Sequence, residues 1–220
     1  MVQSERETHW RRVYEEKAPD AVSWYQAEPA PSLRALDRFG AGPFSSIVDV
    51  GGGASTLVDA LLERGWGDIT VLDIAKPALE AAKARLGPLA ERVKWEVADV
   101  TEWLPARKYD VWHDRAVFHF LTKREQREAY RRALLGGLAE GGLVIMATFA
   151  LDGPERCSGL PVQRYDPESL ANELGRPFRL IEGWREEHVT PWGSGQSFNW
   201  CAFRAETGPS AYVGIQTGRQ

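Results

Sequence analysis

The sequence contains few of the features that mark a specialised class of protein. Only two cysteines occur, Cys157 and Cys201, far apart and without a CxxC pair, so no disulfide framework is expected and a reducing cytoplasm is favoured. The histidines and cysteines show no metal-ligand spacing, which predicts no bound metal. The first residues, MVQSERETHWRR, lack the apolar segment of a signal peptide, and no apolar run is long enough to cross a bilayer.

A basic excess is also absent. The chain has 27 Lys and Arg against 31 Asp and Glu, which gives no support for a nucleic-acid or anionic-membrane partner. What is present is the composition of a globular protein, with 43% hydrophobic residues over 220 positions, enough for one domain with a full core. Nine tryptophans are many for this length, and several lie outside the expected strands, which indicates an aromatic-lined pocket.

Short apolar runs alternate with helical patterns through most of the chain. Strands are expected at residues 47–50, 69–73, 93–97, 109–113 and 143–149, with helices at about 4–17, 33–39, 55–64, 77–87, 122–135 and from 167. Capping boxes at 4–7 and 122–125 mark two helix starts. The last two strands, 178–189 and 196–204, have no helix between them and are expected to be antiparallel neighbours. This order predicts one α/β domain with a largely parallel sheet covered on both faces.

The stretch IVDVGGGAST, residues 47–56, puts three glycines between the first strand and its helix. Ligands of an open parallel sheet bind outside the carboxyl ends of the strands. Glycine there allows a tight turn and a close approach of the ligand to the backbone, and the helix start offers free N–H groups to an anion. Asp73 ends the second strand 22 residues after Gly51 (73 − 51), a spacing that lets a carboxylate accept from both hydroxyls of an adenosine ribose.

Two nucleotide-binding motifs compete for this turn. A dinucleotide site prefers GxGxxG or GxGxxA, but Thr56 occupies the third position, which weakens the case for an NAD-dependent oxidoreductase. A P-loop is excluded more firmly, because no GK[ST] follows the glycines. What remains is an adenosine that carries a small charged tail.

Four motifs together resemble those of the class I S-adenosylmethionine-dependent methyltransferases, over about residues 44–204. They are VDVGGGAST at the glycine turn, VLDIA at the ribose acid, VADV at 97–100 and YDVWHDRAVFHFL at 109–121. The resemblance implies a Rossmann-like, seven-stranded, mostly parallel sheet with an antiparallel carboxyl-terminal hairpin. It also implies a methyltransferase domain at 44–205, a helical and aromatic cap at 1–43, and a loose tail at 206–220.

The resemblance further implies S-adenosylmethionine as the cofactor and assigns its contacts. Gly51 and Gly53, with Asp49 beside them, are expected to hold the methionine part. The rest of the cofactor is expected at Asp73 (ribose hydroxyls), Ile74 (adenine face), Asp99 (adenine amino group), Val100 (alongside Asp99) and Arg115 (sulfonium end). The alternative for Asp99 is a solvated loop acid, and for Arg115 a structural ion pair with Asp110 or Asp114.

The segment HWRRVYEEKAPDAVSWYQAEPAPSL resembles the cap that precedes the first strand in some small methyltransferases. Its aromatic side chains, Trp10, Tyr14, Trp24 and Tyr25, are expected to close over the cofactor, where they would face the sulfonium and exclude water. The alternative is that they only pack the helix against the sheet. Trp24 and Tyr25 lie in a proline-bounded loop, which makes them stronger pocket candidates than Trp10.

Methyl transfer needs an aligned acceptor and, where the acceptor carries a proton, a base. Candidates for the catalytic side are His119, His188, Arg115 and Cys157. His119 has packing at the edge of the core as its alternative, whereas His113 is expected to be structural. The segment CSGLPVQRY, from Cys157, resembles one in tellurite-resistance-type methyltransferases, which act on soft acceptors; the alternative is a buried small hydrophobic residue.

The sequence therefore favours methyl transfer to a small-molecule nucleophile, such as a thiol or a selenium, tellurium or arsenic compound. A protein lysine methyltransferase stays open, because the W…Y…SWY entry also resembles that class, although DRAVFHF stands where an acidic or polar motif is expected. The NPPY-like or DPPF-like motif of nucleic-acid amine methyltransferases is absent from that loop. Outside methyl transfer, an NAD-binding oxidoreductase and a noncatalytic cofactor-binding module remain as alternatives.

Overall fold

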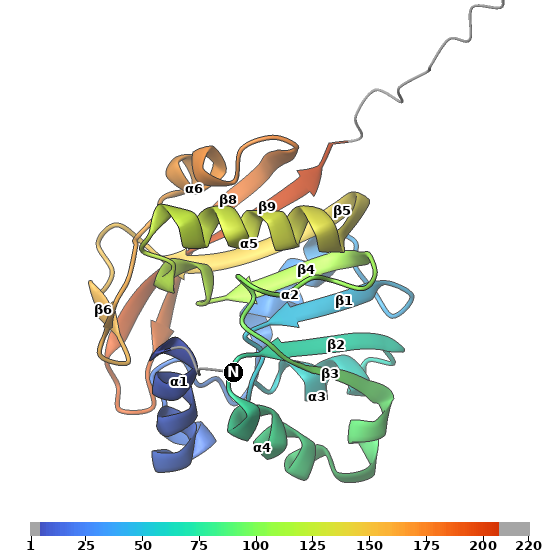
Figure 1. The fold of residues 1–220 in the computed structure, drawn as a ribbon, viewed down its shortest axis with the longest axis vertical. Helices are drawn as coiled ribbons and strands as arrows, with labels where there is room; N and C mark the ends of the chain where they lie inside the picture. Colours follow the sequence, from blue (N-terminus) through green and yellow to red (C-terminus); the bar gives the residue numbers. More distant parts are fainter. Residues whose placement is uncertain (1–4, 207–220) are drawn as a thin grey trace, which may run out of the picture.

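A seven-stranded sheet forms the centre of the protein, and the computed structural model describes residues 5–206 (Figure 1). The strands are β1 (Ser46–Val50), β2 (Asp68–Asp73), β3 (Val93–Val97), β4 (Tyr109–Arg115), β5 (Leu138–Phe149), β8 (Phe178–Val189) and β9 (Gly195–Ala205). Their order across the sheet is β3-β2-β1-β4-β5-β9-β8. β1 to β5 are parallel, and β9 and β8 are antiparallel, so the expected sheet and terminal hairpin are confirmed.

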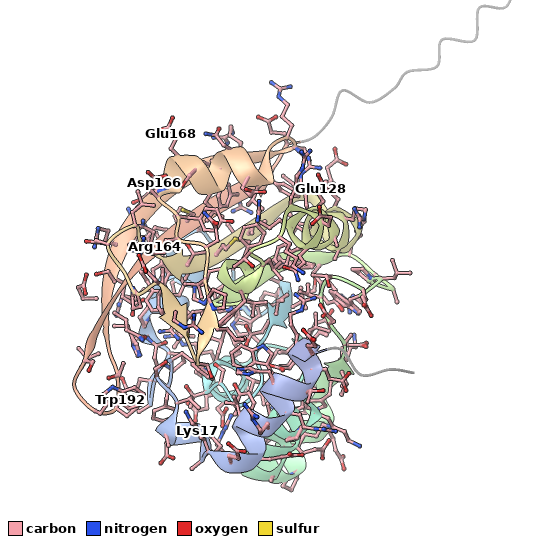
Figure 2. All side chains as sticks on the ribbon, turned by 60° about the vertical axis from the view of Figure 1, so that its left-hand side comes forward. Lys17, Glu128, Arg164, Asp166, Glu168 and Trp192 are labelled. Carbon is pink, nitrogen blue, oxygen red and sulfur yellow. The ribbon has the colours of Figure 1, made fainter. Side chains whose placement is uncertain are left out.

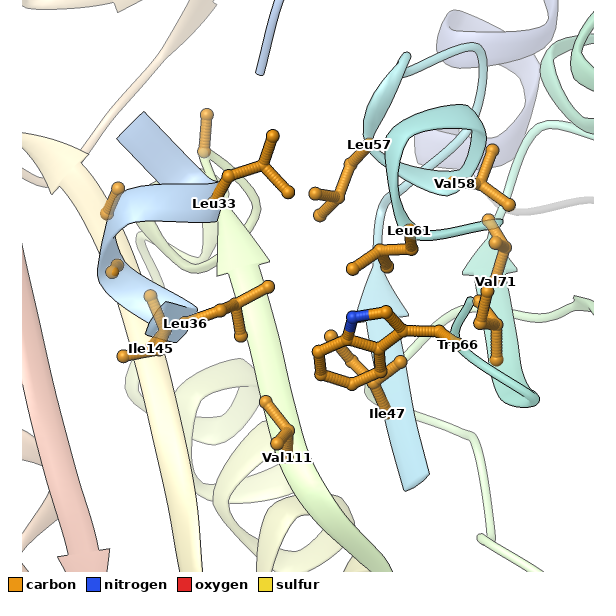
Figure 3. Packing of buried hydrophobic residues seen from close by; sticks show 14 of the residues in the cluster. Leu33, Leu36, Ile47, Leu57, Val58, Leu61, Trp66, Val71, Val111 and Ile145 are labelled. Atoms are coloured by element: carbon orange, nitrogen blue, oxygen red, sulfur yellow. The ribbon is translucent and has the colours of Figure 1, made fainter. Parts of the chain in front are cut away.

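Helices cover both faces of this sheet, because strands such as β1 are buried at every position and are apolar on both sides. One face is covered by α2 (Ala30–Arg38), α3 (Leu57–Glu63) and α4 (Lys76–Leu86), whose leucines pack with Trp66 against β1 and β2 (Figure 3). The other face is covered by α5 (Arg124–Gly137) and α6 (Pro167–Leu174), which bury Tyr130 and Leu170. Two separate apolar layers therefore hold the sheet rigid.

Helix boundaries follow local capping groups. α6 begins after Asp166, whose side chain accepts a hydrogen bond from the Ser169 N–H at 2.8 Å. α5 begins at Arg124, so the expected Thr122–Glu125 capping box is wrong by one position; the Gln126 side chain accepts from the Lys123 N–H instead. The other expected box uses Ser4, which lies outside the described residues, as does nearly all of the expected tail.

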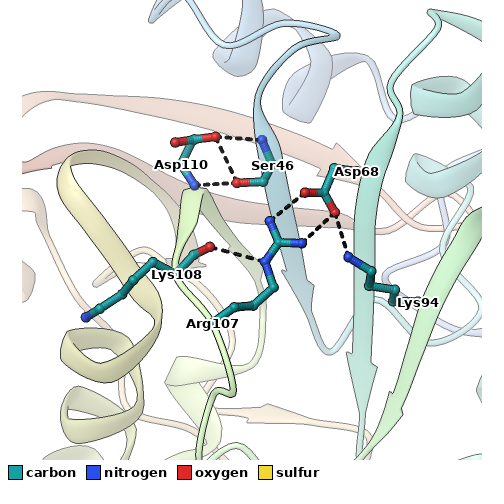
Figure 4. Close-up of polar contacts among 6 residues, drawn as sticks. All are labelled: Ser46, Asp68, Lys94, Arg107, Lys108 and Asp110. Atoms are coloured by element: carbon teal, nitrogen blue, oxygen red, sulfur yellow. Dashed lines mark hydrogen bonds and ion pairs between the residues drawn. The ribbon is translucent and has the colours of Figure 1, made fainter.

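The amino ends of the strands are tied together by polar contacts (Figure 4). Asp68 of β2 accepts from Arg107 and, at 3.1 Å, from Lys94 of β3; the Arg107 guanidinium holds the pKa of that carboxyl below its usual range. Asp110 of β4 accepts from both the N–H and the hydroxyl of Ser46 of β1, each at 2.8 Å. These contacts fix the register at the edge opposite to the expected ligand site.

The carboxyl edge of the sheet is bordered by the remaining elements. α1 (Glu5–Glu16), the turn η1 (Pro19–Ala21), and the small β6 (Arg156–Cys157) and β7 (Leu160–Pro161) hairpin lie there, with Trp192 at the tip of the β8–β9 hairpin (Figures 1 and 2). Two further single turns, η2 (Gly87–Arg92) and η3 (Phe118–Phe120), lie after α4 and β4. None of the helices between residues 5 and 206 has the length and apolarity needed to traverse a bilayer.

Candidate active site

The turn after β1 leaves no room for side chains. The Gly51 N–H donates to the Leu72 carbonyl at 2.7 Å, and Gly51 has a positive φ of 69°. A Cβ at Gly51 would lie 2.0 Å from Cγ2 of Val117, and one at Gly52 would lie 2.5 Å from Oδ2 of Asp49. Glycine is therefore required by close packing as well as by backbone conformation.

Two adjoining pockets open beside this turn. The first holds about 770 Å³ of empty space, counting its open mouth. It is lined by most of the expected cofactor residues and by Cys157: Trp10, Trp24, Gly51, Asp73, Ile74, Asp99, Val100 and Arg115. The second is lined by Trp24, Tyr25, Asp49, Gly51 and Arg115. Gly53, His119 and His188 line neither pocket.

Asp73 lies at the end of β2, buried in the wall of the first pocket. Its Oδ1 accepts from the Ala75 N–H at 2.7 Å. Burial raises the pKa of Asp73 to about 7, and the negative charge of Asp49 adds to that rise. Gly53 lies against this carboxylate, since a Cβ there would be 2.6 Å from Oδ2. Gly53 therefore makes room for Asp73 rather than forming the pocket surface.

Asp99 is held by α1 as well as by its own loop. Arg6 Nη2 donates to Asp99 Oδ2 at 2.6 Å and to Thr101 Oγ1 at 2.8 Å. Asp99 Oδ1 accepts from the Thr101 N–H at 2.9 Å. Asp99 is thus not a freely solvated loop acid. Arg6, which no sequence motif marked, lines the pocket beside it.

Aromatic side chains from the cap and from η3 pack on one another in the wall of the first pocket. The Trp10 ring lies 4.9 Å from Phe120 and 5.6 Å from Trp24, in edge-on contacts, and Tyr14 lies 6.3 Å from Trp24. All four rings line the first pocket. Packing and pocket formation, posed as alternatives from the sequence, are therefore both observed. Phe120 was not among the expected pocket residues, because only the tertiary fold brings η3 to the cap.

Arg115 ends β4 and lines both pockets. It forms no ion pair with Asp110, which is bonded to Ser46, or with Asp114, which accepts from the Tyr130 hydroxyl at 2.6 Å. Its Nη1 donates to the Trp24 carbonyl at 2.8 Å, while Nε and Nη2 are buried without a partner among the described residues. Burial lowers the pKa of Arg115 to about 10, so the side chain remains a cation at neutral pH.

The histidines do not occupy the place of a general base. His119 is fully buried; its Nδ1 accepts from the Phe149 N–H at 3.3 Å, and burial lowers its pKa to about 3. His188 Nε2 donates to the Ser23 carbonyl at 2.7 Å, which ties the β8–β9 hairpin to the cap loop. Neither placement fits the catalytic role expected for these two residues. His113 lies between Asp49 and Ser32, at 2.7 and 3.0 Å, as a structural residue should.

Cys157 lies in β6 and lines the first pocket. It is buried, with Sγ 4.0 Å from the Ser23 hydroxyl, and burial raises the pKa of its thiol to about 11. The side chain is therefore a neutral thiol that forms part of the pocket wall. Across residues 5–206, no group of three or more His, Cys, Asp and Glu side chains is placed to hold a metal ion.

These features fit an adenosine-containing methyl donor. The glycine turn has no space for a Cβ, a buried carboxylate stands at the end of the next strand, and aromatic rings enclose the space between them. The order β3-β2-β1-β4 places all of these groups at one edge, at the point where the strand order reverses.

Comparison with known proteins gives a domain match and a fold. A family model described as a methyltransferase domain matches residues 47–142. Among solved structures, one that concerns the conversion of a disulfide bond into a thioacetal group during echinomycin biosynthesis has a TM-score of 0.73 at 19% identity, covering 94% of this chain and 95% of that one.

Two further structures share the fold. The N-methyltransferase NodS from Bradyrhizobium japonicum WM9, in complex with S-adenosylhomocysteine, has a TM-score of 0.67 at 16% identity, covering 90% of this chain and 98% of that one. The 1,6-didemethyltoxoflavin-N1-methyltransferase of Burkholderia thailandensis has a TM-score of 0.65 at 19% identity, covering 94% and 92%. The domain match and the architecture agree: residues 47–142 match a methyltransferase domain, and the chain has the fold of solved S-adenosylmethionine-dependent methyltransferases.

Proposed function

We propose that the protein transfers the methyl group of S-adenosylmethionine to a small-molecule nucleophile whose reactive atom is a thiol sulfur or another soft atom. One observation carries this proposal: the acceptor end of the first pocket contains no group placed to remove a proton. The described side chains there are aromatic (Trp10, Tyr14, Trp24 and Phe120), a neutral thiol (Cys157) and a cation (Arg115). Burial raises the pKa of the Tyr14 hydroxyl, so this group keeps its proton. Such a site suits an acceptor that is already nucleophilic near neutral pH.

Thiols meet this requirement better than alkyl amines do. A free thiol has a pKa of about 8.5, so a useful fraction is thiolate without help from the protein. An alkyl ammonium has a pKa of about 10.4 and must lose a proton before it can attack. The charge of Arg115 opposes a second cation beside it, which disfavours the protein lysine alternative.

The cofactor residues are assigned on the same basis. In this proposal Asp73 accepts from the ribose hydroxyls, Ile74 and Val100 lie against the adenine, and Asp99 accepts from its amino group. The methionine part lies toward the second pocket, near Asp49 and the glycine turn. These placements are supported by the pockets that the residues line. Residues 1–43 act as a cap over the domain at 44–205, because α1 and the following loop supply Trp10 and Trp24 to the pocket wall.

The reaction is a displacement that needs alignment and a dry site. The donor supplies an electrophilic methyl group on a sulfonium. The acceptor sulfur forms the new S–CH₃ bond with its lone pair as the donor C–S bond breaks, and that electron pair stays on the donor sulfur. Trp10, Trp24 and Phe120 exclude water and place aromatic faces near the positive charge, which their π-electrons stabilise.

The comparisons leave the acceptor atom to experiment. One structural neighbour concerns disulfide and thioacetal chemistry, which involves sulfur, and others are N-methyltransferases. Labelled methyl transfer should be measured with thiols, selenite, arsenite, small amines and a protein fraction of a cell lysate. Labelled small thioethers or other methylated soft atoms are expected. Label found only in amines or only in the protein fraction would overturn the proposal.

A further inference from the structure

Arg115 is a buried cation with two unused donor atoms. The side chain is partly exposed to the two pockets, but Nε and Nη2 are screened from solvent and have no hydrogen-bond partner among the described residues. Nη1 is engaged by the Trp24 carbonyl, which fixes the plane of the guanidinium. Buried donors that stay unpaired destabilise a fold, so this arrangement indicates a partner that the chain does not supply.

The carboxylates nearest to Arg115 are already engaged. Asp49 lies 2.7 Å from His113 Nδ1, and Asp114 accepts from Tyr130 and from the Val117 N–H. Glu186 accepts from Gln26 Nε2 at 3.2 Å and from the Trp200 indole. Glu186 and Asp49 stabilise the Arg115 charge from a distance, yet neither forms an ion pair with it.

Arg115 also lies on the far side of the glycine turn from the adenosine residues. Asp73 ends β2 and Asp99 follows β3, whereas Arg115 ends β4, on the other side of β1 in the sheet. Its guanidinium carbon lies 5.0 Å from the centre of the Phe198 ring of β9. Cys157 of β6 is near enough for Arg115 to influence its thiol. The free donors thus belong to the acceptor half of the site.

We propose that the acceptor carries an anionic oxygen group, such as a carboxylate, and that Arg115 is the residue that selects it. Nε and Nη2 form one edge of the planar guanidinium, which matches a carboxylate with two parallel hydrogen bonds. Because both atoms are screened, the acceptor reaches them only by displacing a neighbouring side chain of the pocket wall. The reacting atom of the acceptor is taken from the proposed function. The anion site at Arg115 does not depend on that function.

The test compares 3-mercaptopropionate with its uncharged amide, 3-mercaptopropionamide. The wild-type protein should favour the carboxylate in kcat/KM by about tenfold or more, because hydrogen bonds to charged groups are worth more than neutral ones. Arg115→Gln should abolish that preference, Arg115→Lys should retain part of it, and the affinity for S-adenosylhomocysteine should change by less than about threefold. Arg185→Gln, at an exposed arginine paired with Asp152, is the matched control and should keep the preference.

Three results would overturn the inference: equal rates for the two thiols with wild type, a preference that survives Arg115→Gln, or a loss of S-adenosylhomocysteine affinity with the preference kept. The last would assign Arg115 to the carboxylate of the donor. If neither thiol is methylated, the acceptor panel decides the proposed function, and the anion site is decided separately by binding of propionate to the protein loaded with S-adenosylhomocysteine. Propionate binding that needs Arg115 supports the site, and no binding overturns it. Urea unfolding confirms folding, and Arg115→Lys replaces Arg115→Gln if that variant is unfolded.

Discussion

At the scale of single residues, Asp73 couples ligand binding to the stability of the empty protein. Its pKa is raised to about 7 in the folded state by burial, from 3.8 in the unfolded chain. The folded protein therefore holds this proton more tightly than the unfolded chain does. The stabilising contribution is full below about pH 4 and is lost as the pH rises toward 7, where a buried carboxylate becomes charged.

Asp73→Asn should separate these two effects. Asparagine keeps the shape and a carbonyl that can accept from the Ala75 N–H, but it removes the buried charge. The thermal midpoint of the ligand-free variant should exceed that of wild type at pH 8, and the difference should shrink as the pH falls and vanish below about pH 4. Its affinity for S-adenosylhomocysteine should fall by about tenfold or more, since charge-assisted hydrogen bonds to the ribose are lost. Calorimetry and thermal denaturation across pH measure both, and unchanged affinity would contradict the ribose assignment.

Gly51 offers a second residue-scale test with a control in the same chain. Gly51→Ala meets Val117 Cγ2 at 2.0 Å and places alanine at a φ of 69°. Gly65→Ala has a similar φ of 81° but no atom within 4 Å. Both should lose about 1–2 kcal/mol of unfolding free energy from the backbone. Gly51→Ala should lose more, and should also bind S-adenosylhomocysteine more weakly; equal losses in urea unfolding would show that Val117 yields without cost.

Single residues also mark the limit of what the sequence predicts. The glycine turn and Asp73 were recognisable because their spacing is fixed by one strand–turn–helix unit and the next strand. The Arg6–Asp99 pair and the unpaired edge of Arg115 depend on contacts 93 and 91 residues apart, which no local pattern encodes. His119 failed as a base because η3 turns it into the core.

At the scale of elements, the Arg6–Asp99 ion pair links α1 to the loop after β3, where the proposal places the adenosine. Arg6→Gln should weaken this attachment by removing the charge from the contact with Asp99. Dissociation of S-adenosylhomocysteine should become several-fold faster, because the start of α1 no longer covers the pocket mouth. Stopped-flow fluorescence of Trp10 and Trp24 reports that step.

Arg12→Gln is the matched control on the same helix. Arg12 approaches Glu16 at 3.9 Å on an exposed face, where such pairs contribute little. Its dissociation rate should equal that of wild type. If the two variants behave alike, α1 does not gate the site through Arg6.

The ends of helices were predictable from the sequence where only one residue at that end can act as a cap. Asp166 before Pro167 and Gly87 after Leu86 gave the start of α6 and the end of α4. α5 starts later than expected because Gln126 accepts the first N–H and Arg127 bonds the Thr122 carbonyl, which leaves Thr122 outside the helix. Competing caps one residue apart cannot be ranked without the tertiary contacts.

At the scale of the whole molecule, the sheet order brings the site together. Strand alternation predicted the parallel sheet and the terminal hairpin, since parallel strands need crossover helices and the last pair has none. The enclosure of the pocket was not predictable in the same way. The pocket is enclosed because the cap, η3, β6 and β9, which are far apart in the sequence, meet at the carboxyl edge of the sheet.

The most direct test of the central claim is the pH dependence of kcat/KM for a series of thiols with different pKa values, measured with saturating S-adenosylmethionine. In the proposed mechanism no side chain between residues 5 and 206 removes a proton from the acceptor, so the rate should follow the thiolate fraction of each acceptor. The midpoint of the pH profile is expected to move with the pKa of the thiol. A midpoint that stays the same for every thiol would show that the protein supplies a base, and would contradict the proposed mechanism.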